Sequence, residues 1–419
     1  MPSECPVFVD QLRFEQNGSV WMKEDLTNAI AGSLLGYLEP RLEVYYEELR
    51  QLCAIECPSS SKLGVDEAGE WVGRWANPRD HWRIRRWPDE IAGDSLLLSV
   101  RGGSRGGVRA LVVAHLDTVY PVGTAAQRPM QREGDRIIGP GTCDNKSGLL
   151  SGLYSMAALE DLGLLEPFDT LSMLCGGDEE TDMRSSSGFL HEVLPECDVA
   201  FVLEAARENG DIVSARKTSA HFVLEVRGKE AHAGVEPWKG ANAILAISQQ
   251  IAALQALNGM RPGVTVNVGV VHGGTLFNVV PGAARAEIDV RASGQDDLGT
   301  VKAAIERIAA TPYVPGTTSS IEGDWRGPPM TKTPAMTALA TLAGSCAREL
   351  GFEVEDVATG GISYANAIAA SGVPVLDGLG PIGGLDHSPD EYVLASSIVP
   401  RTALLALLLY RRAQSVGPR

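Results

Sequence analysis

The chain has 419 residues, of which 44% are hydrophobic and 21% are charged. This length predicts two or three domains and excludes a small disulfide scaffold, and no run approaches the ~18 apolar residues of a membrane span. Lys and Arg number 36 and Asp and Glu number 53, so the net charge is −17. This charge argues against nucleic acid or anionic lipid as a partner. We expect a soluble protein whose acidic residues either form a solvated coat or converge in part on a cation.

Cysteine usage and the first residues bear on localisation. The seven cysteines are scattered and include no CxxC pair, which favours a reducing compartment over zinc fingers or redox chemistry. Residues 1–26 show no basic segment followed by an apolar core, so they do not predict a secretory signal. Both observations favour a cytoplasmic location.

The first half of the chain has the pattern of an α/β domain. Leucine spacing predicts one or two amphipathic helices over residues 26–57, with a break at Pro40. Short apolar runs predict buried strands at 96–100, 111–114, 171–175 and 200–203, and residues 148–162 predict a helix. Because strands and helices alternate, we expect a layered sheet covered by helices.

The pattern changes near residue 214. A strand at 222–226 is followed by a helix at 242–257, strands at 264–271 and 284–290, and a helix at 297–309. The Gly- and Pro-rich segment 323–334 predicts a linker. A helix at 335–350, a strand at 373–376 and a helix at 395–412 then return to the first pattern. We therefore expect residues 214–326 to be inserted into an α/β domain formed by residues 1–213 and 327–419.

Residues able to do chemistry follow the predicted strands. His115 and Asp117 come directly after a buried strand and point to the same side, so His115 can bind a metal while Asp117 orients it. A capped strand end is the alternative. Asp144 lies in a glycine-rich loop before a helix, but the loop lacks the GK[ST] ending of a phosphate-binding loop. Asp144 is therefore either a cation ligand or a helix cap.

Three adjacent acids, residues 178–180, follow the next strand. They repel one another unless a cation or solvent compensates, and neighbouring side chains face different ways. One carboxylate can thus hold a metal while the next handles the proton of a water molecule, or the segment is a solvated acidic turn. Glu204 ends another strand, and His387 follows a distant one. Two histidines and three carboxylate sites together make up the ligand set of a two-metal hydrolytic centre.

The order of these motifs resembles the M20 family of metallopeptidases, particularly its glutamate carboxypeptidase-like and aminoacylase-like members. The resemblance covers about residues 42–409 and is carried by HLDTV, GPGTCDNKSG, GGDEE, FVLE, GKEAHAG, NVVP, EIDVR and LDHSPDEYV. It implies a zinc-exopeptidase-like catalytic domain with an inserted α+β lid and dimerisation domain.

The resemblance also implies roles for individual residues. Two zinc ions per subunit would be held by five ligands, His115 and Glu204 on one ion, Glu180 and His387 on the other, and Asp144 as the bridge. Glu179 matches the general base, Asp117 matches the acid behind the first histidine, and a cis peptide is expected at Asp144-Asn145. The same ligand set also accepts cobalt or manganese.

The inserted domain acquires a role by the same resemblance. In a homodimer, His232 would reach the partner's active site and stabilise the oxyanion. Asn278, Arg291 and the backbone near Gly360 would bind a substrate carboxylate, for which a bidentate arginine is well suited. The alternatives are a surface loop position for His232 and an ion pair at a strand end for Arg291.

The sequence departs from the family pattern in three places. Asn145 and Ser147 replace other small or apolar residues beside the bridging acid, which leaves the chemistry intact. Tyr364 stands where the family usually has an aspartate near the substrate end of the site, so substrate preference is in doubt. Asp211 stands where some glutamate-releasing relatives have a basic residue, and Arg216 and Lys217 are the nearby sources of positive charge.

The sequence therefore predicts a dizinc hydrolase that cleaves an amide or peptide bond next to a free carboxylate, with small peptides or N-acyl amino acids as substrates. One alternative is a biosynthetic deacylase dedicated to a single intermediate, which Tyr364 makes more credible. Another is a catalytically silent binding or carrier homologue, against which Glu179 and the complete ligand set argue.

Overall fold

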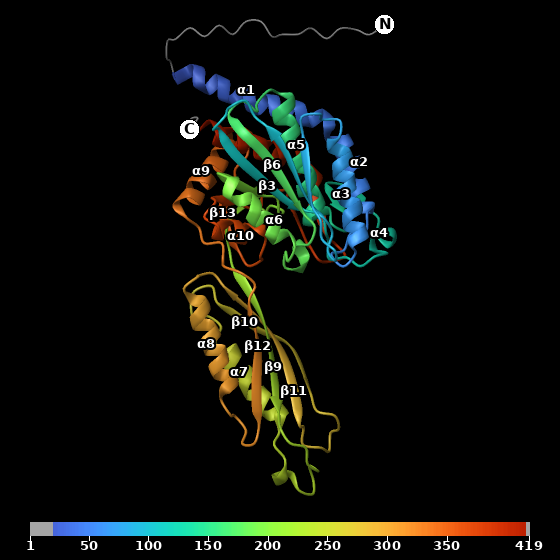
Figure 1. Ribbon diagram of the computed structural model, residues 1–419, viewed down its shortest axis with the longest axis vertical. Helices are drawn as coiled ribbons and strands as arrows, with labels where there is room; N and C mark the ends of the chain where they lie inside the picture. Colours follow the sequence, from blue (N-terminus) through green and yellow to red (C-terminus); the bar gives the residue numbers. More distant parts are fainter. Residues whose placement is uncertain (1–19, 416–419) are drawn as a thin grey trace.

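The computed structural model describes residues 20–415, with side chains from residue 29 onward. Residues 1–19, which include Cys5 and most of the segment in which no secretory signal is predicted, lie outside this range. The molecule is elongated, with a larger domain joined to a smaller one by two chain crossings (Figure 1). No helix within residues 20–415 is long and apolar enough to cross a membrane. The six described cysteines are all free.

The larger domain is built on a six-stranded sheet whose strands are short apolar runs, as the sequence predicts. Its order is β1 (Arg83–Trp87), β2 (Ser95–Arg101), β6 (Phe168–Gly176), β3 (Val108–His115), β7 (Val199–Val202) and β14 (Val375–Leu376). β3 runs parallel to both β6 and β7, while β1 and β2 form an antiparallel edge. The parallel strands therefore end at one edge of the sheet, where ligands bind in α/β folds.

Helices cover both faces of this sheet. One face packs against α5 (Ser147–Asp161) and α11 (Ala395–Gln414), with α1 (Val20–Leu38) and α9 (Pro334–Glu349) outside them, and the other against α6 (Ser186–Val193) and α10 (Tyr364–Ala370). The break predicted at Pro40 is confirmed, because a single 3-10 turn separates α1 from α2 (Leu42–Ala54). The remaining elements of this domain are α3 (Lys62–Ala76), α4 (Thr124–Gln127), β4 (Gln131–Glu133), β5 (Arg136–Ile138), β8 (Ile212–Arg216), β13 (Asp356–Thr359), β15 (Gly383–Gly384) and β16 (Tyr392–Leu394).

The smaller domain is an antiparallel sheet with two helices and a hydrophobic core of its own. Its strand order is β10 (Thr265–Gly273), β11 (Ala283–Ala292), β9 (Thr218–Arg227) and β12 (Thr318–Trp325), and its helices are α7 (Ala243–Gln255) and α8 (Asp297–Ala310). The alternating burial of β9 and β11 reflects one face turned to the helices and one to solvent.

Two boundaries predicted from the sequence are wrong. Residues 323–325, assigned to a linker, complete strand β12, which pairs with β9 along its whole length. The Gly-Asp pair mimics a turn, whereas Ile321 and Trp325 pack against the core and fix the strand. β14 is also shorter than the predicted strand and begins at Val375.

Candidate active site

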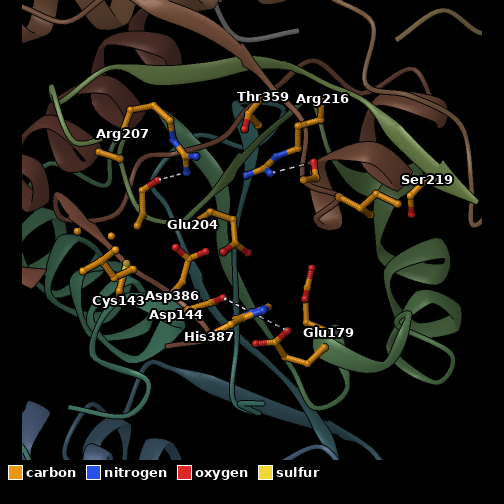
Figure 2. A pocket seen from close by; sticks show the side chains of 18 of the residues that line it. Cys143, Asp144, Glu179, Glu204, Arg207, Arg216, Ser219, Thr359, Asp386 and His387 are labelled. Atoms are coloured by element: carbon orange, nitrogen blue, oxygen red, sulfur yellow. Dashed lines mark hydrogen bonds and ion pairs between the residues drawn. The ribbon is translucent and has the colours of Figure 1, made fainter. Parts of the chain in front are cut away.

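The candidate site lies at the carboxyl edge of the central sheet. His115 is the last residue of β3, the 3-10 turn Glu179–Thr181 follows β6, and Glu204 follows β7. A pocket of about 620 Å³ opens there, and Asp144, Glu179, Glu204 and His387 point into it (Figure 2). The fold thus gathers side chains from segments that are far apart in the sequence.

Asp144 occupies the centre of this cluster. Its Oδ1 lies 2.8 Å from Nε2 of His115, and its Oδ2 lies 3.2 Å from Nε2 of His387. One carboxylate thus presents one oxygen to each of two imidazoles, which is the arrangement of a bridging ligand.

The other two carboxylates flank the two imidazoles. Oε2 of Glu180 lies 3.3 Å from Nε2 of His387, and Oε1 of Glu204 lies 3.9 Å from Nε2 of His115. Oε1 of Glu180 and Oε1 of Glu204 are buried without a hydrogen-bond partner. Buried unpaired carboxylate oxygens are costly unless a cation binds them, so these residues fit a metal centre. Ligand atoms of His115, Asp144 and Glu180 lie within 4.8 Å of one another.

The charges in the cluster are strongly coupled. Burial raises the pKa of Glu204 to about 8, with the negative charge of Asp144 adding to the effect. Burial also raises the pKa of Glu179 well above its usual range. Hydrogen bonds to Asp144 and Glu180 raise the pKa of His387 to about 11. Burial opposes ionisation of Asp144, but the hydrogen bonds from both histidines outweigh it and lower its pKa. Such crowding of acids is the environment that divalent cations neutralise.

The loop that carries Asp144 is held by an acid that the sequence prediction did not assign. The carboxylate of Glu391 accepts hydrogen bonds from the backbone N–H groups of Gly141, Cys143 and Asp144, at 2.9, 2.7 and 2.9 Å. The cis peptide expected at Asp144-Asn145 is present. Glu391 belongs to the LDHSPDEYV motif, so its place in that motif was the available signal.

Asp117 lies beneath the cluster and is completely buried. Its Oδ1 is 3.3 Å from Nδ1 of His115, and its two oxygens accept the N–H groups of Glu179 and Glu180, each at 3.1 Å. Ser59, which the sequence did not single out, donates its hydroxyl to the same carboxylate at 2.6 Å. The carboxylate of Asp117 therefore holds the backbone of the two adjacent glutamates, while the backbone carbonyl of Asp117, 3.0 Å from Nδ1 of His115, fixes the histidine ring.

Asn145 supports the opposite side of the centre. Its Nδ2 donates to Oε2 of Glu204 and to the carbonyl of Leu203, both at 3.1 Å. The side chain that departs from the family pattern thus orients one of the expected ligands.

Basic residues line the wall opposite the acids. Arg216 is 5% exposed; its Nε lies 2.6 Å from Asp377, and its Nη1 donates to the carbonyl of Gly361. Arg291, from the smaller domain, donates to the carbonyl of Gly360 at 2.7 Å and lies 3.1 Å from Asp289. Arg291 and the Gly360 loop are therefore together at the pocket, and Arg216 supplies positive charge there.

His232 and Asn278 lie elsewhere in the chain. Both are in exposed loops of the smaller domain, where the N–H of Ala233 donates to the carbonyl of Asn278 and His232 pairs with Val279. Neither lines the pocket. One chain brings these two residues together but does not bring them to the cluster of acids.

Two of the residues that depart from the family pattern lie away from the pocket. Tyr364 is not at the substrate end, because it is completely buried, donates its hydroxyl to Ser186 at 2.6 Å and packs against Gly176 beneath the Glu179 turn. Asp211 is also buried, and its carboxylate accepts from Asn209 and from the N–H of Glu355. Both residues hold the local fold and do not face a substrate.

Comparison with known proteins shows which chains this one is similar to. Residues 214–317 match the M20 peptidase dimerisation domain. Carboxypeptidase G2 of a Pseudomonas species is 27% identical over 322 residues, covering 76% of this chain and 77% of the relative. Acetylornithine deacetylase of Aliivibrio fischeri is 26% identical over 407 residues, covering 89% and 98%. The structure of a dinuclear metal-binding M20 peptidase from Bacillus subtilis superposes with a TM-score of 0.66 at 17% identity, covering 90% and 100%.

The α/β architecture and the expected resemblance to the M20 metallopeptidases are therefore confirmed. The chain is a hydrolase that is similar to members of this family. More narrowly, it is a metal-dependent enzyme of the group that acts on peptide or amide bonds.

Proposed function

We propose that the protein is a dizinc hydrolase that cleaves an amide or peptide bond next to a free carboxylate. The observation that carries this proposal is Asp144, whose two oxygens each face one imidazole, His115 on one side and His387 on the other. Residues 1–213 and 327–419 would form the catalytic domain, and residues 214–326 the lid and dimerisation domain.

We propose a set of ligands for each ion. His115 and Glu204 would hold one zinc, Glu180 and His387 the other, and Asp144 would bridge them. Bound metal ions supply Lewis acidity, which polarises the scissile carbonyl and lowers the pKa of water. Histidine and carboxylate ligands suit zinc and also cobalt or manganese, so zinc is the proposed ion and the others are possible substitutes.

Glu179 is the proposed general base. It lines the pocket beside the ligands, and the bond from its N–H to Asp117 fixes its backbone. Its carboxylate takes a proton from the attacking water and later delivers it to the nitrogen of the leaving amine. Burial and the negative charges of the neighbouring carboxylates raise the pKa of Glu179, which favours its uptake of the proton.

Arg291 and the backbone near Gly360 are the proposed site for the substrate carboxylate. Arg291 lies on a strand of the lid and already spans to the catalytic domain through the Gly360 carbonyl. A guanidinium binds a carboxylate in bidentate fashion, which fixes the orientation of the scissile bond. The proposed substrates are accordingly small peptides or N-acyl amino acids, as with the carboxypeptidase and deacetylase relatives.

A homodimer would complete the site. The matched dimerisation domain carries His232 and Asn278 in exposed loops away from its own pocket. We propose that His232 of the partner subunit stabilises the oxyanion and that Asn278 of the partner subunit binds the substrate carboxylate. Closure of the lid would then exclude water.

The acidic chain makes nucleic acid and membranes poor partners, and free cysteines fit the cytoplasm, which we propose as its location. A silent carrier is the competing function, but it has no use for an ordered Glu179. Tyr364 no longer favours a deacylase dedicated to one intermediate, because this residue lies in the core.

Turnover of a panel of N-acyl amino acids and dipeptides tests the proposal. The parent enzyme should hydrolyse some of them, and Glu179→Gln should lower kcat by about 10²–10⁴ while retaining its metal. Equal turnover by parent and variant would refute the role of Glu179, and no turnover of any substrate by the metal-loaded parent would favour the carrier.

A further inference from the structure

A second polar groove lies on the central sheet, apart from the active site. It has a volume of about 320 Å³, within the range of small-molecule sites. Its floor is formed by β1, β2, β6 and the start of β3, and its wall by the end of α6 and the following turn. Core residues such as Phe189 cover the same sheet face nearer the active site, so the groove begins where this cover stops.

The groove is separate from the catalytic pocket. It includes Arg109 near the amino end of β3, whereas His115 ends the same strand. The two residues are six positions apart along the strand, which corresponds to about 20 Å. The two cavities share no lining residue.

Positive charge gathers in this groove on a chain whose net charge is −17. Its lining includes two acids, Glu192 and Glu196, against five basic residues: His81, Arg83, Arg85, Arg101 and Arg109. Arg85 pairs with Glu192 at 2.6 Å and Arg109 pairs with Asp198 at 3.2 Å, so the charge that remains in the groove comes mainly from the other two arginines.

Two of the arginines are little neutralised. Arg83 forms no ion pair with any residue of the described part of the chain. Arg101 is 72% exposed, and its ion-pair partner, Asp169, is 3.8 Å away. Both guanidinium groups are available to a ligand.

Three hydroxyls stand among the arginines. Ser99 lies opposite Arg83 on one side and Ser172 on the other, while Thr170 lies between Arg101 and Arg109. Within residues 29–415, none of the three hydroxyls forms a hydrogen bond to another side chain or to the backbone. The strand register therefore sets a row of free donors beside a row of cations.

We propose that this groove binds a phosphate monoester of a small metabolite. Guanidinium groups and hydroxyls are the donors that proteins use for phosphate, and an exposed arginine pairs with it in bidentate fashion. A carboxylate has only two oxygens and is satisfied by one arginine, whereas three hydroxyls, the unpaired Arg83 and the weakly paired Arg101 match the three terminal oxygens of a phosphoryl group. This site does not depend on the hydrolytic function.

Titration calorimetry and ³¹P NMR of the enzyme as purified, with inorganic phosphate and glycerol phosphate as probes and acetate as the carboxylate control, test the proposal. The double variant Arg83→Ala/Arg101→Ala should weaken binding of both phosphates at least tenfold. Thr170→Val/Ser172→Ala, which keeps every charge, should weaken it about threefold to tenfold. The matched control is Arg74→Ala/Arg105→Ala, which removes two exposed arginines outside the groove.

Each outcome has a definite meaning. Weaker binding in the groove variants alone, with hydrolytic turnover and melting temperature unchanged, supports the site. Phosphate binding that is equal in all variants and competitive with substrate places the anion at the metal centre and overturns the proposal. Acetate binding as tightly as phosphate, or no phosphate binding at 10 mM ligand (roughly the weakest affinity of interest), also overturns it.

Discussion

The family motifs imply two groups of functional residues, one at the carboxyl edge of the central sheet and one in exposed loops of the smaller domain. The two groups differ in whether a single chain brings their side chains together at the pocket. The chain places His115 and His387 each in direct contact with Asp144. His232 and Asn278 are left in solvent-exposed loops that do not line the pocket. The first group can act within one chain, whereas the second needs another chain or a large movement. Motif order alone does not distinguish these situations, and the structure does.

The largest effect should follow from removing the bridge. Asp144→Ala should abolish detectable hydrolysis and lower the metal content of the purified protein, because both imidazoles lose the carboxylate that faces them. Metal content by mass spectrometry and turnover measure the effect. Asp80→Asn, an exposed acid outside the pocket, serves as the control and should change neither. Full metal content with full activity in Asp144→Ala would show that this edge is not the metal centre.

Mixing subunits tests the separation of the two regions. His232→Ala and Glu179→Gln should each lower kcat, the former by about 10²–10³ as expected for loss of an oxyanion donor. When the two variants are mixed and exchange subunits, one site of each mixed dimer has an intact Glu179 and the intact His232 of the partner subunit. Turnover should therefore recover in the mixture. If His232 acts on the pocket of its own chain, no mixed dimer contains a complete site and turnover stays low.

A smaller effect is expected at the contact that supports Glu204. Asn145→Ala removes the amide that donates to Oε2 of Glu204, and loss of such supporting contacts typically lowers metal affinity by 10–100-fold. Metal dissociation followed with a chelator measures this change. Asn258→Ala, which loses an amide bonded to the backbone of the smaller domain, is the matched control. Equal metal affinity in the two variants would show that Asn145 does not support metal binding.

The sequence predicted the strand ends and the residues that follow them because buried parallel strands are short apolar runs and their carboxyl ends share an edge. The sequence did not predict the hydrogen-bonding residues that hold these strand ends in place. Glu391, Asn145 and Ser59 act through hydrogen bonds across 247, 59 and 58 residues of chain, and no local pattern encodes such contacts. Strand β12 was missed for a different reason, since its Gly-Asp pair resembles a turn until pairing with β9 is known. Tyr364 was misplaced because its family position was taken as its spatial position.

The smallest effect concerns Tyr364, and it separates a structural role from a role in specificity. Its hydroxyl bonds Ser186 beneath the turn that carries Glu179, so Tyr364→Phe leaves a buried Ser186 hydroxyl without this partner. We expect a loss of about 1–2 kcal/mol in the free energy of unfolding, measured by denaturant titration, with the relative kcat/KM of different substrates unchanged. Tyr46→Phe, which removes a hydroxyl that forms no hydrogen bond with another described residue, is the control and should be nearly neutral. A changed ranking of substrates in Tyr364→Phe at unchanged stability would show that Tyr364 affects substrate preference. We do not expect this result, because the phenol is buried in the core and does not line the pocket, whereas Glu179 and Glu180 do.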